Sequence, residues 1–361
     1  MKNNNNRVFL DVHAIQTVPP SCINRDDTGS PKTAQYGGVT RARVSSQSWK
    51  KAIRQYFLDR GDLKNVGIRS LEIVRYIAEK IVALDCSIDN ESAMKLAQEV
   101  INAAGVSTTK DYKTKALFFI SSKQAERLAQ AALDQKTNKN ELQEILNSDP
   151  AIDIALFGRM VADDPILNID ACCQVAHAIS THEVQTEFDF FTATDDLSSA
   201  DNAGAGMLGT IEFNSSTLYR YANVAVHEFT RQVGDRDMVT NALKLFVEAF
   251  IKSMPTGKAN TFANQTLPQA VLICLRADRP VNLISAFERP VRSSNGYVTL
   301  SIERLMNEYE VVKQYVEEPL CAFSLGIEDF PANKSSLKQL LDQLEAELTV
   351  IFQKSSLGEG L

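Results

Sequence analysis

The order of strand-like and helix-like stretches constrains the fold of this chain more than any other feature. Strand-like runs rich in Val, Ile and Phe occupy 7–15, 175–193, 210–213, 217–229 and 269–277, and amphipathic helical patterns occupy 46–59 and 237–254. The stretch 61–170 between the first helix and the second strand region is helical in pattern. The order strand, helix, insertion, two strands, helix, strand is that of a ferredoxin-like split βαβ unit, the layout of an RRM. We therefore predict an α+β protein.

The segments between these elements are predicted from their composition. Three apolar periodicities predict helices inside the insertion, and 110–120 is a candidate short strand. The stretch 16–38 contains three Pro and three Gly, which predicts a long loop. The Gly-, Ser-, Asn- and Asp-rich stretch 195–216 predicts a hairpin extension or an arm. From 301 onward the pattern predicts a helical tail.

The stretch 37–54 combines a glycine turn, a basic extended piece and a helix start. Ser45 or Ser46 is a suitable N-cap, because a serine hydroxyl accepts a backbone N–H of the first turn. Trp49, Ile53 and Phe57 fall on one face of the predicted helix. The opposite face carries its polar and basic residues, Gln47, Lys50, Lys51 and Arg54. A cationic face beside a helix start suits a phosphate backbone, although a solvated amphipathic helix has the same pattern.

Charge is distributed unevenly along the chain. The formal net charge is −7, which argues against diffuse binding to nucleic acid. From 28 to 69, however, there are nine basic residues and two acidic ones, Asp59 and Asp62. A local basic patch on an acidic protein leaves one track for a polyanion.

Several classes of protein are not indicated. There is no apolar run of about 18 residues for a membrane span, and 1–6 lacks the apolar region of a secretory signal. The six cysteines have no C-x-x-C spacing, which favours a reducing cytoplasm over disulfides or zinc. We expect a cytoplasmic protein without a membrane segment, a cofactor or a metal.

Two motif matches are weakened by their context. Residues 204–209 match G-x-G-x-x-G, but no strand precedes them and no helix follows, so a dinucleotide site is not predicted. Residues 48–51 match the S-x-x-K of serine acyl enzymes without the companion motifs of that class. His177 and His182 are five residues apart, which is not ligand spacing on a helix or a strand.

Several longer motifs together resemble the CasC family, the backbone subunit of the type I-E CRISPR surveillance complex, Cascade. They occur in family order and cover most of the chain up to about residue 301: PSCINRDD at 20–27, GG at 37–38, R-x-RVSSQS-x-K-x-A-x-R at 41–54, DIAL-x-GRM at 153–160, AHAI-x-TH at 176–182, D-x-FTA-x-DDL at 189–197 and YRYAN at 219–223.

The resemblance implies a protein shaped like a right hand. It implies an RRM-like palm, a helical finger insertion and a β-hairpin or arm as thumb, with these expected boundaries: palm 1–60, fingers 61–172, palm 173–194, thumb 195–224, and palm with C-terminal helices 225–361. The implied partners are CRISPR RNA, further copies of the chain in a head-to-tail filament, other Cascade subunits and, through the guide, target DNA.

The resemblance also implies site residues. Arg25, Ser45, Gln47, Lys50 and Arg54 are implied to touch the guide backbone, and Met160 to pack against bases near a kink. Arg159, in the same motif as Met160, is a further RNA-binding candidate. We add Arg41, Arg43 and Lys51 from charge and spacing. Relatives can carry basic residues at 39–40, where this chain has Val39 and Thr40, and Lys32 is a candidate to supply the positive charge instead. Met207 and Leu208 are candidates for an apolar thumb tip, because inserted apolar side chains unstack bases.

Two expectations stand beside these. Lys136 and Lys139, in a polar part of the insertion, are candidates for contact with target DNA. The competing hypothesis is an enzyme, an RRM-like protein that processes or cleaves RNA with loop carboxylates. Asp26 and Asp27 are its nearest candidates.

Overall fold

The structure is a computed structural model that describes residues 7–60, 66–193 and 207–356. The chain divides into two compact units. The sheet unit comprises Met1–Gln55, Val175–Asn223 and Phe246–Leu361, and the helical unit comprises Tyr56–Gln174 and Val224–Leu245. The predicted insertion at 61–172 lies within the helical unit, which also takes in 224–245, a stretch that the sequence assigned mainly to the last palm segment.

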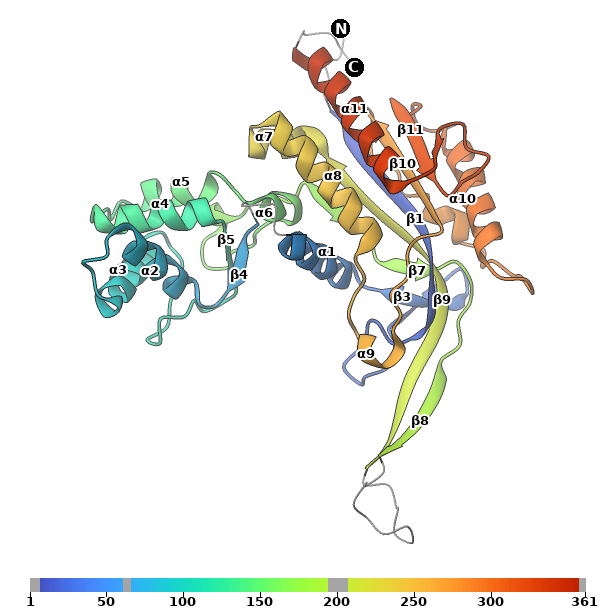
Figure 1. Ribbon diagram of the computed structural model, residues 1–361, viewed down its shortest axis with the longest axis horizontal. Coiled ribbons are helices and arrows are strands. Elements are labelled where there is room, and N and C mark those ends of the chain that lie inside the picture. The colour runs from blue at the N-terminus through green and yellow to red at the C-terminus, as the bar shows by residue number, and fades with distance from the viewer. Residues whose placement is uncertain (1–6, 61–65, 194–206, 357–361) are drawn as a thin grey trace. The chain divides into compact units, whose positions relative to one another are not determined.

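The sheet unit is built on one large, mostly antiparallel sheet (Figure 1). Among the described residues its strand order is β12-β11-β10-β1-β9-β7-β3-β2, and β6 and β8 also pair with β9. The bounds are β1 (Phe9–Ser21), β2 (Thr33–Tyr36), β3 (Val39–Val44), β6 (Cys173–Val175), β7 (Ala178–Ser180), β8 (Glu187–Ala193), β9 (Met207–Ala225), β10 (Ala270–Arg276), β11 (Cys321–Leu325) and β12 (Asn333–Lys334). The predicted α+β class is confirmed.

Both faces of this sheet are buried at its central strands. Every residue of β10 is buried, as are the first eight of β1. On one face Tyr219, Tyr221 and Leu272 pack against η3 (Leu283–Phe287) and α10 (Val298–Val312). On the other face Val44 and Leu218 pack with Trp49 of α1 (Ser46–Arg60). Strands covered on both sides have long apolar runs, which explains why these segments are recognisable in the sequence.

The predicted long loop at 16–38 is wrong in part. Strand β1 continues to Ser21, and β2 and β3 form a hairpin in which Tyr36 pairs with Val39. Its two turn residues, Gly37 and Gly38, have φ values of 61° and 79°. Positive φ at both central positions is the requirement of a two-residue hairpin turn, so Gly-Gly was the signal for this hairpin.

Strand β9 also differs from the prediction. The two runs 210–213 and 217–229 form one strand, Met207–Ala225, and the chain then enters α7 (Val226–Val233). Val226 and Phe229 are buried three residues apart, as helix packing requires. Strands β8 and β9 pair from Glu187↔Phe213 to Ala193↔Met207, so this hairpin begins before the predicted arm (Figure 1). Residues 194–206 of the arm lie outside the described residues.

The C-terminal part is not purely helical. Helix α10 is followed by β11 and β12, which extend the sheet beside β10, and then by α11 (Leu337–Ser356). Helix α8 (Arg236–Lys252) and the short α9 (Ala259–Phe262) precede β10. None of the helices in the described ranges combines the length and apolar composition needed to cross a membrane.

The helical unit has its own core. The three predicted amphipathic runs are α2 (Ile73–Leu84), α3 (Asn90–Ala103) and α4 (Ser122–Leu133), whose apolar faces meet in one cluster. The predicted strand at 110–120 is reduced to β5 (Phe118–Ile120), which pairs with β4 (Ile68–Ser70). Helices α5 (Lys139–Asn147) and α6 (Ile152–Phe157) and the 3-10 turn η1 (Pro165–Leu167) complete the elements of 66–174.

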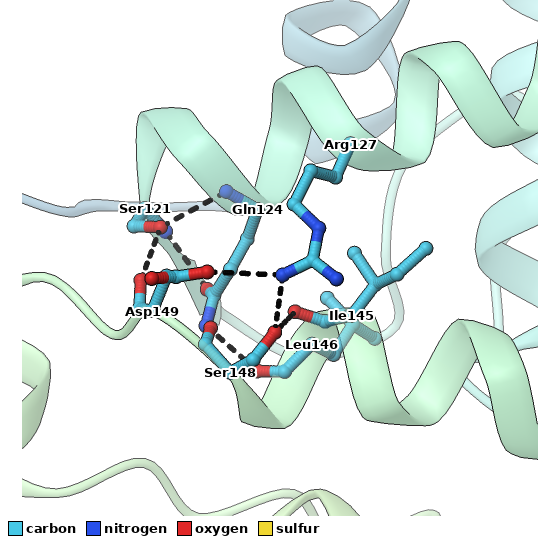
Figure 2. Close-up of polar contacts among 7 residues, drawn as sticks. All are labelled: Ser121, Gln124, Arg127, Ile145, Leu146, Ser148 and Asp149. Atoms are coloured by element: carbon cyan, nitrogen blue, oxygen red, sulfur yellow. Dashed lines mark hydrogen bonds and ion pairs between the residues drawn. The ribbon is translucent and has the colours of Figure 1, made fainter.

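Polar contacts fix the end of α5 against the start of α4 (Figure 2). Ser121 and Gln124 form a capping box, with the Gln124 backbone N–H 3.1 Å from the Ser121 hydroxyl. The Gln124 side chain donates to the carbonyls of Leu146 (2.7 Å) and Ser148 (2.8 Å). Since Gln124 is fully buried, these bonds satisfy an amide that would otherwise be costly to bury.

Candidate nucleic-acid interface

Helix α1 is fixed to the sheet unit through Trp49. This side chain is 1% exposed and packs among Ala42, Val44 and Leu218. The guanidinium of Arg220 lies 3.6 Å from the centre of the Trp49 ring and 4.3 Å from that of Phe250. A buried cation between two aromatic faces is stabilised by their quadrupoles. The contact sets the rotation of α1 and therefore the direction of its polar face.

The start of α1 is capped by Ser45. The Ser48 backbone N–H donates to the Ser45 hydroxyl (3.3 Å), and the Ser45 backbone N–H donates to Asn24 Oδ1 (2.8 Å). Ser45, rather than Ser46, is therefore the N-cap. Its side chain is buried, so the hydroxyl that the resemblance assigns to the guide already stabilises the helix start.

The polar face of α1 points away from the Trp49 cluster. Gln47 and Lys51 are exposed, and Lys50 and Arg54 are half-buried. The first turn of α1 contains no acidic residue. Residues four apart are neighbours on a helix surface, so Lys50 and Arg54 form adjacent positive charges on this face of α1. This face has the charge and geometry of an anion-binding surface.

Arg25 lies in an exposed loop of the sheet unit that is closed by Asp26. The Asp26 carboxylate accepts hydrogen bonds from Thr28 Oγ1 (2.7 Å), the Thr28 backbone N–H (3.0 Å) and the Ser30 backbone N–H (3.0 Å). These bonds, first of all the one from the Thr28 hydroxyl, hold the pKa of Asp26 below its usual value. Asp26 thus shapes the loop that presents Arg25.

Lys258 is a basic residue of the same region that the sequence analysis missed. The positive charges of Arg25 and Lys258 both act on the Cys22 thiol, opposing the burial that raises its pKa. Gly257 packs so tightly that a Cβ there would lie 2.2 Å from the Ile23 carbonyl oxygen. Lys258 itself has φ of 51°, a costly conformation for a lysine. No local pattern indicates that 256–258 meets a loop more than two hundred residues earlier.

Arg41 and Arg43 have different surroundings although both are in β3. Arg41 is fully buried and donates to the carbonyls of Tyr36 (3.1 Å), Ser180 (2.9 Å) and Phe287 (2.8 Å). The RNA contact expected at Arg41 stays a prediction, and the inward use of its donors disfavours it. Arg43 is half-exposed, and its Nε donates to the Thr33 carbonyl (3.1 Å).

The motif at 158–160 of the helical unit contains one buried and one exposed side chain. Arg159 is 4% exposed and donates to the carbonyls of Leu167 (2.9 Å) and Leu146 (2.9 Å), and burial lowers its pKa to about 10. The RNA contact predicted at Arg159 stays a prediction, and it is disfavoured because the Arg159 donors join chain segments. Met160 is 86% exposed, a large apolar side chain in water. That position suits a contact with a base or another apolar group.

The two candidate DNA-binding lysines are exposed and each lies near an acid of the helical unit. Lys136 Nζ is 3.8 Å from Glu141, and Lys139 Nζ is 2.8 Å from Asp164. The Lys139 contact holds the pKa of Asp164 below its usual range. Each lysine must exchange an acidic neighbour for a phosphate before it can bind DNA, which reduces the gain.

The backbones of Met207 and Leu208 belong to β9, paired with Ala193 and Thr192. Their side chains, predicted as the thumb tip, lie outside the described residues. The same hairpin carries two exposed aromatic residues that the sequence analysis did not single out, Phe188 (67% exposed) and Phe190 (65%). Being two apart, they lie on one face of β8.

Within 7–60, 66–193 and 207–356, no group of three or more His, Cys, Asp or Glu side chains is placed to hold a metal. His182 is engaged with the Glu183 carbonyl (2.7 Å) and the Thr217 backbone N–H (3.0 Å). All six cysteines are free thiols, of which four are buried.

Comparisons with known proteins agree on one family. The model of a family described as CT1975-like protein matches residues 10–348. A chain of a "CRISPR RNA-guided surveillance complex, pre-nicking" is similar to this chain, with 33% identity and a TM-score of 0.82 over 94% of this chain and 100% of that one. A chain of another "CRISPR RNA-guided surveillance complex" has 28% identity and a TM-score of 0.72 over 94% and 99%. No curated protein sequence matches. The protein therefore belongs to the CT1975-like family, the CasC-type family that its motifs resemble.

Proposed function

We propose that this protein is a non-catalytic, CRISPR RNA-binding backbone subunit of a Cascade-type surveillance complex of type I-E. The observation that carries the proposal is the polar face of α1, which Trp49 and Arg220 hold in a fixed direction and on which Lys50 and Arg54 are neighbours. The similarity to chains of RNA-guided surveillance complexes supports the same assignment.

The chemistry of this surface favours contacts to phosphate and sugar. Its polar groups are Lys50, Lys51, Arg54 and Gln47 on α1, with Arg25, Arg43 and Lys258 in the same unit. Long cationic side chains such as these bind a phosphate backbone but do not discriminate bases. A guide whose bases must pair with target DNA requires this kind of sequence-tolerant grip.

The proposed architecture assigns a role to each part. The strand order β10-β1-β9-β7 supports an RRM-like palm, because a ferredoxin-like sheet places the first strand between the fourth and the third. The helical unit is assigned as fingers and the β8–β9 hairpin as thumb. Copies are proposed to bind one guide head to tail, with other Cascade subunits and target DNA reached through that filament.

Charge reversal on α1 tests the proposed surface. The double variant Lys50→Glu, Arg54→Glu is expected to lose retention of CRISPR RNA during purification of the complex and to bind single-stranded RNA at least about tenfold more weakly, because two phosphate contacts become repulsive. Fluorescence anisotropy at several salt concentrations measures this, and the salt dependence of the remaining binding becomes shallower.

The matched control reverses the charges of two lysines in or beside β12, which lies at the opposite edge of the sheet from β2. Lys334 belongs to β12 and Lys338 to α11, which packs on β11 and β12. The double variant Lys334→Glu, Lys338→Glu makes the same change in net charge and is expected to bind RNA normally. Normal assembly of the α1 variant on RNA contradicts the assignment of the surface. Metal-dependent RNA cleavage that is lost on Asp27→Ala contradicts the non-catalytic role.

A further inference from the structure

The register of β2, β3 and β7 brings three basic groups to one face of the sheet. Thr33 pairs with Ala42, and the Arg43 backbone N–H donates to the Lys32 carbonyl (2.9 Å), so Lys32 is opposite Arg43. Val44 pairs with Ala178, which places His177 opposite Ser45. Residues opposite each other or two apart share a face. Lys32, Arg43 and His177 therefore lie on the face opposite to Val44, which packs with Trp49.

A hydrogen bond between Arg43 and His177 defines the protonation state of the histidine. Arg43 Nη1 lies 3.2 Å from His177 Nδ1. A guanidinium can only donate, so Nδ1 must be the acceptor and the proton of the neutral ring is on Nε2. His177 is exposed on the surface. The Arg43 Nε is already bonded to the Thr33 carbonyl, which holds the guanidinium in place.

The surroundings of His177 disfavour its charged form. Three effects lower the pKa of His177: its partial burial, which is the largest, and the positive charges of Arg43 and Lys32. Strand β7 itself has no ionisable side chain. The ionisable groups of the neighbouring chain segments are Arg41 and Arg43 from β3, Lys32 before β2, and the phenols of Tyr219 and Tyr221 from β9, whose pKa values are raised by burial. The acidic side chains near this region, Glu183 and Glu288, act on Arg41, whereas the charges that act on His177 are the positive ones of Arg43 and Lys32.

We propose that Lys32, Arg43 and His177 form a binding site for a phosphate group of the guide RNA, and that filling the site protonates His177. The proton comes from solvent and adds to Nδ1. Because the ring then has donors on both nitrogens, the Arg43–His177 hydrogen bond breaks and both side chains donate to the phosphate oxygens. The negative phosphate supplies a counter-charge. The inference rests on the proposed RNA-binding function and adds that binding takes up a proton.

The affinity for RNA is expected to depend on pH, because phosphate binding is coupled to protonation of His177. Because bound phosphate raises the pKa of His177 above its value in the free protein, affinity increases as the pH falls through the range between these two values. Each unit of that rise corresponds to about a tenfold gain in affinity. We expect roughly three- to tenfold tighter binding near pH 5.5 than near pH 8, the range in which histidines titrate.

The experiment measures the affinity of the full chain for oligouridylate across this pH range at constant ionic strength, because uracil does not titrate there. The variant His177→Gln keeps an oxygen that accepts from Arg43 but cannot become charged, and it is expected to bind with a flat pH profile. The control His227→Gln changes a half-buried histidine of α7 in the helical unit and is expected to retain the wild-type profile. NMR of the His177 ring, free and with oligouridylate, reports its titration directly.

The outcomes separate the two proposals. A wild-type affinity that tightens toward low pH, lost in His177→Gln and kept in His227→Gln, supports the site. Oligouridylate binding that is independent of pH, or an unchanged His177 titration on binding, overturns the site and leaves the proposed function standing. The absence of oligouridylate binding at every pH overturns both.

Discussion

Four arginines of this protein show how burial decides the role of a side chain. Arg41, Arg159 and Arg220 are buried and donate to protein oxygens, whereas Arg43 reaches the surface beside His177. In the sequence Arg41 and Arg43 are two positions of one basic run. Their difference depends on the segment at 285–289, which covers Arg41, and local spacing carries no information on that contact.

Asp11 is a buried carboxyl in the middle of the sheet unit. It accepts hydrogen bonds from the Tyr221 hydroxyl (2.8 Å) and the Val281 backbone N–H (3.0 Å). Burial nevertheless raises its pKa from 3.8 to about 7. The folded protein therefore keeps the Asp11 carboxyl protonated at pH values at which the unfolded chain, in which this carboxyl has a lower pKa, has already lost the proton. Between these two values the stability contributed by this proton is lost as the pH rises.

We predict that Asp11→Asn reduces the loss of stability between about pH 5 and pH 8, by on the order of 2–4 kcal/mol. Asparagine keeps an oxygen for Tyr221 but carries no proton to lose. The measurement is the urea midpoint at both pH values for wild type and variant. His13, whose pKa burial lowers to about 3, adds an opposite trend to both proteins, so it cancels in the comparison.

The exposed Asp342 of α11 provides the control for this experiment. Asp342→Asn removes the same charge from the surface and is expected to follow the wild-type pH dependence. An Asp11→Asn protein that loses as much stability as the wild type at high pH would show that Asp11 is not protonated in the fold.

At the scale of single elements, regular patterns were predictable and short strands were not. Helix α1 was found from its cap and its apolar spacing, and Trp49, Ile53 and Phe57 are buried as expected. Strands β2, β11 and β12 have only two to five residues each, so their pairing depends on the neighbouring strand. One local feature indicates the β2–β3 hairpin, the Gly-Gly turn, and the prediction of a long loop did not take it into account.

The two glycines of that turn make a matched pair. Both have positive φ, but a Cβ on Gly37 would lie 1.6 Å from the Glu288 carbonyl oxygen, and a Cβ on Gly38 meets nothing within 4 Å. We predict that Gly38→Ala costs about 1 kcal/mol, the strain of the left-handed conformation alone. Gly37→Ala is predicted to cost at least about 2 kcal/mol more, because backbone must move.

Thermal unfolding of the two alanine variants tests this difference. Equal unfolding midpoints for Gly37→Ala and Gly38→Ala would mean that the turn does not pack against 288. The comparison matters for the candidate interface, since the same hairpin carries Arg43 and fixes its distance from His177.

At the scale of the whole molecule, the order of elements was readable but their partners were not. The sequence separated the strand regions from the helical stretch 61–170, and the structure confirms the α+β class. Phe9 pairs with Arg276 and Arg25 acts on the same thiol as Lys258, contacts between segments more than two hundred residues apart. Such contacts follow from the completed sheet, which explains why Lys258 and His177 were absent from the predicted site.

Native mass spectrometry of the complex, assembled on two CRISPR RNAs that differ in spacer length, tests whether this chain is a backbone subunit that polymerises along the guide. We predict several copies of this chain on each RNA, with more copies on the longer one, because each copy binds its own stretch of phosphate backbone. A single copy on both RNAs would contradict it and would identify an RNA-binding adaptor instead.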